Sequence, residues 1–310
     1  MKTSAKVLSL LTVMAMAASF TSCVSMNNIY SHAEEYTAGD REISDVIESV
    51  DINWNSGSVT VTTYDKDTVS VVEKCSAELK ESQQVHTWVD GKTLHVQYCK
   101  SGENVSLKNA QKDLEIKIPK SFELDDIVYD GASGASTFEN ITASTIDLDT
   151  ASGNIMLTNC SADSFVVDTA SGDVIIEQTG EASSMNLNAA SGSISITADS
   201  ADDFDIDTAS GDIYLNVKSS NTVKIDSASG KNELHFGTFP SDISIDTASG
   251  DVNLFIPEKS DFTLNIDTAS GDLNSDISFT KEKGKYIFGN GTNNMSVDTA
   301  SGDVTIKSEE

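Results

Sequence analysis

The residues with the most chemistry in this sequence are aspartates that recur on both sides of the tripeptide Ala-Ser-Gly. One column of acids precedes the tripeptide and includes Asp168, Asp207, Asp246 and Asp267. A second column follows it and includes Asp173, Asp212, Asp251 and Asp272. Clusters of carboxylate oxygens are the ligands that Ca²⁺ prefers, so these eight residues are candidate cation-binding residues.

A structural interpretation of the same columns competes with the cation site. Asp and Asn side chains accept hydrogen bonds from nearby backbone N–H groups and so stabilise turns. Asn188 replaces an aspartate of the first column, and its amide keeps the hydrogen bond but not the charge. Lys231 interrupts the second column, and the glycine-rich nonapeptide of calcium β-rolls is not matched. Local turns are therefore the favoured interpretation, and Ca²⁺ is the only cofactor left open; no transition-metal site is predicted.

The elements that position these aspartates are predicted from the spacing of the repeat. The tripeptide glycines follow one another at intervals of 19 to 21 residues, with a last interval of 31; they are Gly134, Gly153, Gly172, Gly192, Gly211, Gly230, Gly250, Gly271 and Gly302. Apolar and polar residues alternate on both sides of each copy, which indicates strands. Each copy is too small to bury its own apolar face. We expect an all-β, single-chain parallel β-solenoid of about nine to ten coils of ~19 residues, with right-handed winding.

The remainder of the chain divides around this repeat. Residues 131–310 form the repetitive solenoid, with a hairpin insertion near residues 276–291 that turns at Gly284. Residues 49–130 form an N-terminal β cap and the first coils, which cover an edge that would otherwise aggregate. The cap contains a hairpin at Asp90-Gly91 whose predicted register places His86 opposite His95. Cys75 and Cys99 end neighbouring strands and are a candidate disulfide.

The N-terminal sequence resembles an export signal. Lys2 and Lys6 precede about a dozen apolar residues, and Phe20-Thr21-Ser22-Cys23 resembles a lipobox. We expect residues 1–22 to be a lipoprotein signal peptide, Cys23 to be the lipidation site, and residues 23–48 to be a flexible tether. The protein is then exported through the Sec route and lipid-anchored in the cell envelope, at the outer membrane, facing the periplasm or the cell surface.

The charge of the chain excludes one class of partner. Its 20 Lys and Arg residues stand against 49 Asp and Glu residues, for a formal net charge of −29. A nucleic-acid binder neutralises phosphates with basic side chains, so no nucleic acid partner is expected. Anionic membrane surfaces repel the chain for the same reason, and membrane contact is expected only through the lipid anchor.

Several motifs together resemble a known family. The Ser-Gly-Asp bends, the Ile118-Pro119 corner, the Gly289-Asn290-Gly291 loop and the final Asp298–Asp303 segment are similar to a bacterial family of unknown function called putative adhesins. The resemblance extends from about Val50 to Lys307. It implies a secreted or envelope-anchored β-solenoid and provides no catalytic residues to carry over.

These observations predict a non-enzymatic cell-envelope lipoprotein, with an adhesin-like β-solenoid as its interaction module for a protein or a glycan. One alternative is an acidic binder or sensor of cations or cationic peptides in envelope stress. A second alternative is a polysaccharide-active β-helix enzyme, which needs a local exception to the repeat. The coil that contains Lys231, Glu233 and His235 is the only such exception. Because no other catalytic set is present, we expect no enzymatic activity.

Overall fold

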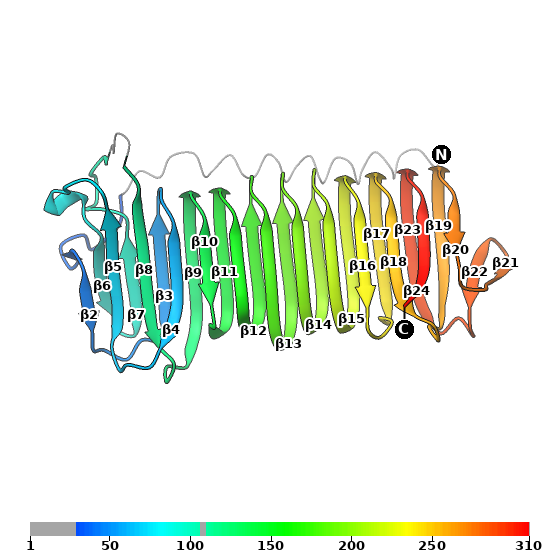
Figure 1. The fold of residues 1–310 in the computed structure, drawn as a ribbon, viewed down its shortest axis with the longest axis horizontal. Coiled ribbons are helices and arrows are strands. Elements are labelled where there is room, and N and C mark those ends of the chain that lie inside the picture. Colours follow the sequence, from blue (N-terminus) through cyan, green and yellow to red (C-terminus); the bar gives the residue numbers. More distant parts are fainter. Residues whose placement is uncertain (1–28, 106–109, 310) are drawn as a thin grey trace. The chain divides into compact units, whose positions relative to one another are not determined.

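The structure is a computed structural model that describes residues 29–105 and 110–309. The predicted signal peptide and the predicted lipidation site Cys23 lie outside the described residues. The chain divides near Gly172 into two compact units, here called the N-terminal unit (described from residue 29 to 171) and the C-terminal unit (172–309). Figure 1 shows that strands dominate both units. In each unit, strands pair in parallel into two sheets with apolar side chains between them, which confirms the predicted all-β solenoid.

The N-terminal unit consists of twelve strands in two sheets. One sheet has the order β1–β6–β7–β3–β9–β11–β12, and the other has the order β2–β5–β8–β4–β10–β12. Its strands are β1 (Thr37–Ala38), β2 (Arg41–Ile43), β3 (Ser49–Trp54), β4 (Val59–Tyr64), β5 (Val69–Cys75), β6 (His86–Asp90), β7 (Thr93–Gln97), β8 (Lys112–Pro119), β9 (Leu124–Ser133), β10 (Ser136–Glu139), β11 (Thr142–Ser152) and β12 (Ile155–Thr169). β12 contributes to both sheets because it turns a corner at Asn159 and Cys160.

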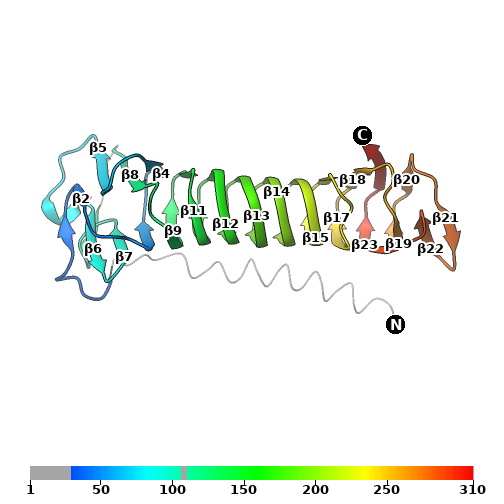
Figure 2. The same ribbon diagram turned by 90° about the horizontal axis from the view of Figure 1, so that it is seen from below.

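The C-terminal unit follows the same plan. One sheet runs β13–β14–β15–β17–β23–β19–β22–β21, and the other runs β13–β14–β15–β16–β18–β24–β20. Figure 2 shows β17, β23 and β19 on the side opposite β18. The strands are β13 (Val174–Ala189), β14 (Ile194–Thr208), β15 (Ile213–Ser229), β16 (Asn232–Phe236), β17 (Asp242–Ser249), β18 (Val252–Pro257), β19 (Phe262–Ser270), β20 (Leu273–Ser275), β21 (Thr280–Glu282), β22 (Lys285–Phe288), β23 (Asn293–Ser301) and β24 (Val304–Glu309).

The last coil of the chain does not lie at the end of the stack. β23 pairs with β17 on one side and with β19 on the other, and β24 lies between β18 and β20 in the same way. The predicted hairpin forms from β21 and β22, turns at Lys283 and Gly284, and pairs antiparallel with β19. Phe288 thereby stacks on Phe262, with ring centroids 4.4 Å apart and both side chains fully buried. The hairpin therefore covers the edge of the first sheet.

Part of the predicted tether is folded. β1 pairs with β6, β2 pairs with β5, and Ile43 and Ile47 are buried. Tyr30 Oη donates a hydrogen bond of 2.9 Å to the backbone carbonyl of Cys99. The tether prediction is wrong for residues 29–48, because two isoleucines and two very short strands give almost no periodic signal yet complete the sheet edges.

The register predicted for the cap hairpin is also wrong. Asp90 pairs with Thr93, so Gly91 and Lys92 form the turn. His86 consequently pairs with Gln97, while Trp88 pairs with His95 and stacks on it at 5.4 Å. His95 Nδ1 lies 2.9 Å from Asp51 Oδ2 rather than beside a second histidine. The expected histidine pair is absent.

Candidate functional site

The glycines of the repeat allow successive rungs to approach closely at each bend. A Cβ atom added to Gly153 would lie 1.9 Å from the carbonyl oxygen of Gly134, and one added to Gly211 would lie 1.9 Å from that of Gly192. Both glycines also have positive φ, at 136° and 155°. No side chain fits in this space. In the C-terminal unit the column has the order Gly172, Gly192, Gly211, Gly230, Gly250, Gly302 and Gly271, which repeats the strand order.

The second aspartate column is used in hydrogen bonds between rungs. The Oδ1 atom of Asp173 accepts from the backbone N–H of Ser193 at 2.9 Å, and that of Asp212 accepts from Lys231 N–H at 2.8 Å. Asp251 accepts from Asp303 N–H and Asp303 from Asp272 N–H, both at 2.9 Å. The sequence predicted a turn within one coil, but these bonds join neighbouring rungs. Each such aspartate satisfies a backbone donor that the bend leaves outside the strand ladder.

The first column in the C-terminal unit has a lysine of the same chain beside it. Asp207 pairs with Asp226 across β14 and β15, and the side chain of Asp207 is buried. Lys224 Nζ lies 2.9 Å from Asp205 Oδ1 and 3.0 Å from Asp226 Oδ2. The pKa of Asp207 is raised to about 6, chiefly by burial; the Lys224 charge opposes the rise, and the charges of Asp226 and Asp205 add to it. The carboxylates here are thus partly compensated by a lysine of the chain itself.

The first column in the N-terminal unit has no lysine of this kind in register. Asp149 pairs with Asp130 on β9 and with Asp168 on β12. Burial, and to a smaller extent the charges of Asp168, Asp147 and Asp130, raise the pKa of Asp149 to about 7. Like charges one rung apart cannot all stay ionised without cost. This stack therefore holds a proton near neutral pH.

The candidate cation-binding residues do not converge on one point. Among residues 29–105 and 110–309, no group of three or more His, Cys, Asp or Glu side chains has an arrangement that could hold a metal ion. Asp168, Asp246 and Asp267 take part in other interactions within the fold. Calcium binding by the columns stays a prediction.

The exceptional coil brings together residues that the sequence analysis singled out and others that it missed. Lys231 forms an ion pair with Glu233, and His235 Nε2 lies 3.2 Å from Glu233 Oε1. His235 Nδ1 lies 3.1 Å from Glu309 Oε2, which comes from β24. The His235 ring stacks on Phe255 with centroids 4.2 Å apart and an interplanar angle of 2°, and Tyr214 lies 5.4 Å away on the other side. Tyr214, Phe255 and Glu309 were missed, although alternation with buried Ile213 and Leu254 places the two aromatic residues on the outside.

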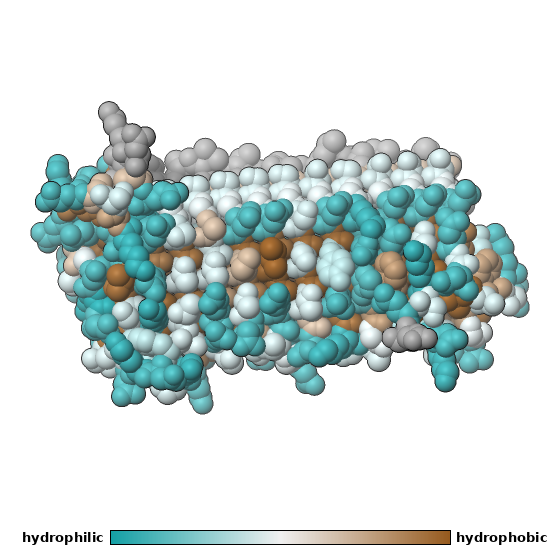
Figure 3. All heavy atoms as spheres, viewed as in Figure 1, coloured by the Kyte–Doolittle hydropathy of each residue, from teal (hydrophilic) through white to brown (hydrophobic). Residues whose placement is uncertain are grey.

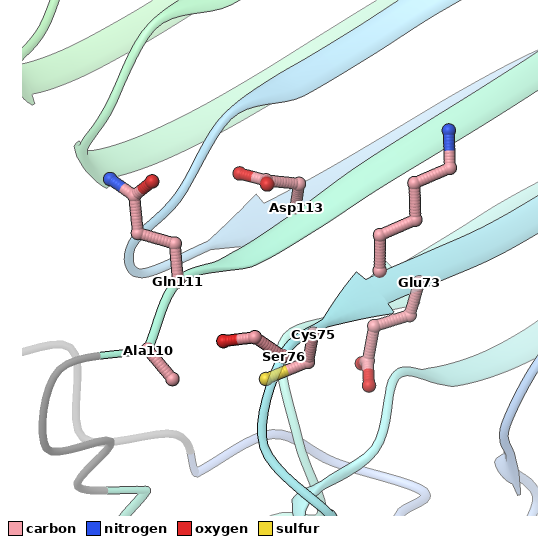
Figure 4. Close-up of a pocket in the computed structure, with 7 residues that line it drawn as sticks. Glu73, Cys75, Ser76, Ala110, Gln111 and Asp113 are labelled. Atoms are coloured by element: carbon pink, nitrogen blue, oxygen red, sulfur yellow. The ribbon is translucent and has the colours of Figure 1, made fainter.

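The two cysteines of the cap are not joined in the structure. Cys75 and Cys99 are both free thiols. Cys99 is buried, and its Sγ atom lies 3.6 Å from the carbonyl oxygen of Glu103. Cys75 instead lines an open cavity of about 810 Å³. Figure 4 shows this cavity, to which β5 contributes Glu73 and Cys75 and the start of β8 contributes Asp113. The candidate disulfide is therefore not formed in this conformation.

One protein family matches most of this chain. The family model described as Toastrack DUF4097 matches residues 47–236 and 179–307. The chain belongs to this family. Toastrack proteins have a β-solenoid-like fold, and the function of the family is unknown. No curated protein matches the Toastrack chain.

Solved structures resemble the fold at low sequence identity. A putative adhesin from Parabacteroides merdae aligns with a TM-score of 0.52 and 13% identity, covering 89% of this chain and 97% of its own. A putative lipid binding protein from Parabacteroides distasonis aligns with a TM-score of 0.52 and 15% identity over the same shares. At this identity, the likeness concerns the fold alone. Within the described part of the Toastrack chain, no helix is long and apolar enough to cross a membrane.

Proposed function

We propose that this Toastrack protein is a non-enzymatic, lipid-anchored cell-envelope protein whose solenoid is an adhesin-like interaction module for a protein or a glycan. The naming of solved relatives such as the Parabacteroides merdae protein as putative adhesins supports this class. The proposal assigns export to residues 1–22 and anchoring to Cys23.

The observation that carries the proposal is the contrast between the repeated residues and the exceptions. The repeated glycines and second-column aspartates serve contacts between rungs. The exceptions, above all Tyr214, His235 and Phe255, are partly exposed on the outer face. A large side chain that does not serve the core and breaks the repeat is a candidate for contact with a partner.

The charges at the exceptional coil argue against acid catalysis. Lys231 and then His235 hold the pKa of Glu233 below its usual value. A glycosidase needs one carboxylic acid that stays protonated, with a raised pKa. Glu233 has the opposite shift, so we infer that this cluster positions side chains rather than cleaving polysaccharides.

The acidic face supports the second candidate function, a binder or sensor of cations or cationic peptides. On this face Asp298 pairs in register with Asp246 on β17 and with Asp267 on β19. Exposed ion pairs are screened at high ionic strength. Binding of a cationic peptide that disappears by about 0.5 M NaCl favours this function, whereas binding that survives favours the adhesin-like one.

Two experiments test the envelope location. Replacing Cys23 by Ser is expected to release the protein from the membrane fraction, and unchanged fractionation would contradict lipid anchoring. Protease treatment of intact cells then distinguishes the two orientations. Digestion of the solenoid supports adhesion at the surface, and protection until the outer membrane is opened places the module in the periplasm.

A binding survey tests the module itself. The mature chain, purified without its lipid, is applied to arrays of glycans and to immobilised envelope and extracellular-matrix proteins. Saturable binding to members of either class, retained at about 0.5 M NaCl, is the expected result. If the chain bound no glycan and no protein, the remaining role for the solenoid would be that of a structural spacer without a ligand.

A further inference from the structure

We propose that the outer surface of β15, β16 and β18 around Tyr214, His235 and Phe255, here called the aromatic row, is a binding site for a neutral glycan chain. This inference rests on the proposed interaction function and specifies its ligand class. Figure 3 looks onto this face, where hydrophobic surface in the C-terminal unit lies open between polar side chains.

The aromatic row breaks the composition of the outer surface. The register places its members on adjacent rungs, with His235 opposite Phe255 and two residues from Glu233, the partner of Tyr214. Other outward positions on these rungs and on the neighbouring β14 and β24 carry hydroxyl and amide groups, namely Ser195, Thr197, Asn216, Asn253 and Thr305, and they lie beside the charged residues Glu233 and Lys307. On the opposite sheet, the outward residues of β17, β23 and β19 are Ser244, Asp246, Ser296, Asp298, Asn265 and Asp267, without an aromatic ring.

Tyr214, at one end of the row, is partly exposed. Ser195 is the register partner of Tyr214 on β14, and its side chain is too short to cover a phenol ring. At the other end, Lys307 Nζ lies 5.4 Å from the centroid of the Phe255 ring. Sugar rings present C–H groups on one face and hydroxyls around their edge. An open aromatic face flanked by amides and hydroxyls matches both parts of that chemistry.

The charges of the row select a neutral ligand. Lys231 is paired with Glu233, His235 lies between Glu233 and Glu309, and Lys307 lies over the Phe255 ring, so two lysines match the two glutamates around the row. A polyanionic glycan would be repelled by the net charge of −29. A cationic peptide would be drawn to the opposite, aspartate-rich face. A neutral, hydroxyl-rich chain is the ligand for which neither penalty applies.

The row is also held rigid before any ligand arrives. Both ring nitrogens of His235 face carboxylate oxygens, at 3.2 and 3.1 Å, and its ring is held against Phe255. Glu309 comes from the inserted strand β24, so the terminal coil contributes one of the two carboxylates that orient His235. Rings that are already ordered lose little side-chain entropy on binding.

Affinity electrophoresis in gels that contain mannan, xylan, β-1,3-glucan or galactan tests this proposal, with the mature chain and its variants. We expect retardation of the parent chain by at least one of these neutral polysaccharides. Tyr214→Ala and Phe255→Ala should each weaken the retardation at least tenfold. Tyr214→Phe keeps the ring and should preserve most of it.

The matched control is Ser244→Ala together with Asp246→Asn, on the opposite face of the same unit. Thermal melting confirms that each variant is folded, as expected for partly exposed positions. If the neutral polysaccharides bind equally well to Tyr214→Ala and Phe255→Ala, the assigned site is wrong and the adhesin-like function stands. If the parent chain binds only proteins or charged glycans, the ligand class is wrong. If it binds nothing in either survey, the proposed function itself fails.

Discussion

The backbone N–H of Asp272 donates a hydrogen bond of 2.9 Å to the carboxylate of Asp303, which lies 31 residues further along the chain. Asp303 in turn donates its own N–H to Asp251. The final coil is thus bonded on both sides by coils that precede it in sequence. The C-terminal end of the chain consequently occupies an interior position of its sheet, where each strand has a neighbour on both sides.

Removal of the final coil is therefore expected to damage the interior of the C-terminal unit. A chain that stops after Asn290 loses β23 and β24, so β17 and β19 no longer have their shared neighbour. We expect a loss of at least about 5 kcal/mol, the lower end of the stability of a typical domain. Urea unfolding followed by circular dichroism measures it.

The control for this truncation removes only residues 308–310. Among these residues, the exposed Glu309 contacts His235, and the exposed Ser308 donates its N–H to Asp276. A cost of about 1 kcal/mol or less is expected, as for other exposed polar contacts. Equal losses in the free energy of unfolding from the two truncations would show that the interior position of β23 adds nothing to stability.

The glycine column predicts a large effect from a single methyl group. Gly192→Ala places a Cβ atom 2.0 Å from the carbonyl oxygen of Gly172 at a φ of 124°. The backbone cannot move there without separating the two neighbouring rungs, so we expect the free energy of unfolding to fall by at least about 3 kcal/mol. Gly91→Ala is the matched control, because Gly91 has a φ of 61° with no atom near its added Cβ, and about 1 kcal/mol is expected. Equal shifts in the urea midpoint would contradict the close-approach argument.

The carboxylate stack of the N-terminal unit predicts that stability falls with rising pH. The pKa of Asp149 is raised to about 7 in the fold, by burial and by its neighbours. An unfolded aspartate titrates near pH 4, so the folded state binds the extra proton between about pH 4 and 7. Stability falls across that window because the unfolded state releases the proton while the folded state still binds it. Above about pH 7 the stability stays low.

Asp149→Asn removes this dependence. At pH 8 the variant is expected to be about 1–2 kcal/mol more stable than the parent, because two repulsions across neighbouring rungs disappear. Below about pH 4 the difference should vanish. Asp163→Asn, at an exposed position, controls for the loss of one negative charge. Thermal melting from pH 4 to pH 8 provides the measurement, and a gain that is independent of pH would refute the shared-proton explanation.

Removal of Lys224 in the C-terminal unit is expected to lower stability, in contrast to the gain expected for Asp149→Asn. Lys224→Met leaves Asp205, Asp207 and Asp226 without their positive partner. The Lys224 side chain is 47% exposed, so solvent screens part of the attraction, and we expect a loss of about 1 kcal/mol at pH 8. The loss should be smaller at pH 5, where Asp207, with its pKa raised to about 6, becomes protonated.

Lys218→Met is the control for this substitution. Lys218 pairs with Asp199 on the surface, and its side chain is 78% exposed. Its removal should cost less than about 0.5 kcal/mol at either pH. If both lysine substitutions cost the same, Lys224 is an ordinary surface residue rather than the counterion of the column.

The sequence alone determined the repeating features of this protein. Period-two alternation and the recurrent Ala-Ser-Gly predict parallel rungs, because a rung of this size is stable only against another rung. The hairpin at Gly284 and the outward position of the aspartates were predictable for the same local reason. Tyr214 and Phe255 also occupied outward positions of the pattern, but nothing local showed that they would meet His235.

Only the tertiary structure decided which rungs are neighbours at the ends. β23 carries the same Asp-Thr-Ala-Ser-Gly pattern as β17 and β19, so the pattern fits sequential stacking and insertion equally well. The choice depends on pairing across 31 and 52 residues, and on the Phe262–Phe288 stack that covers the edge left by β19. The contact of His235 with Glu309 depends on the insertion of β24, whereas the charge compensation by Lys224 depends on the register between β14 and β15. Identical repeats specify a rung, whereas the exceptions to the repeat, placed by long-range pairing, specify the site.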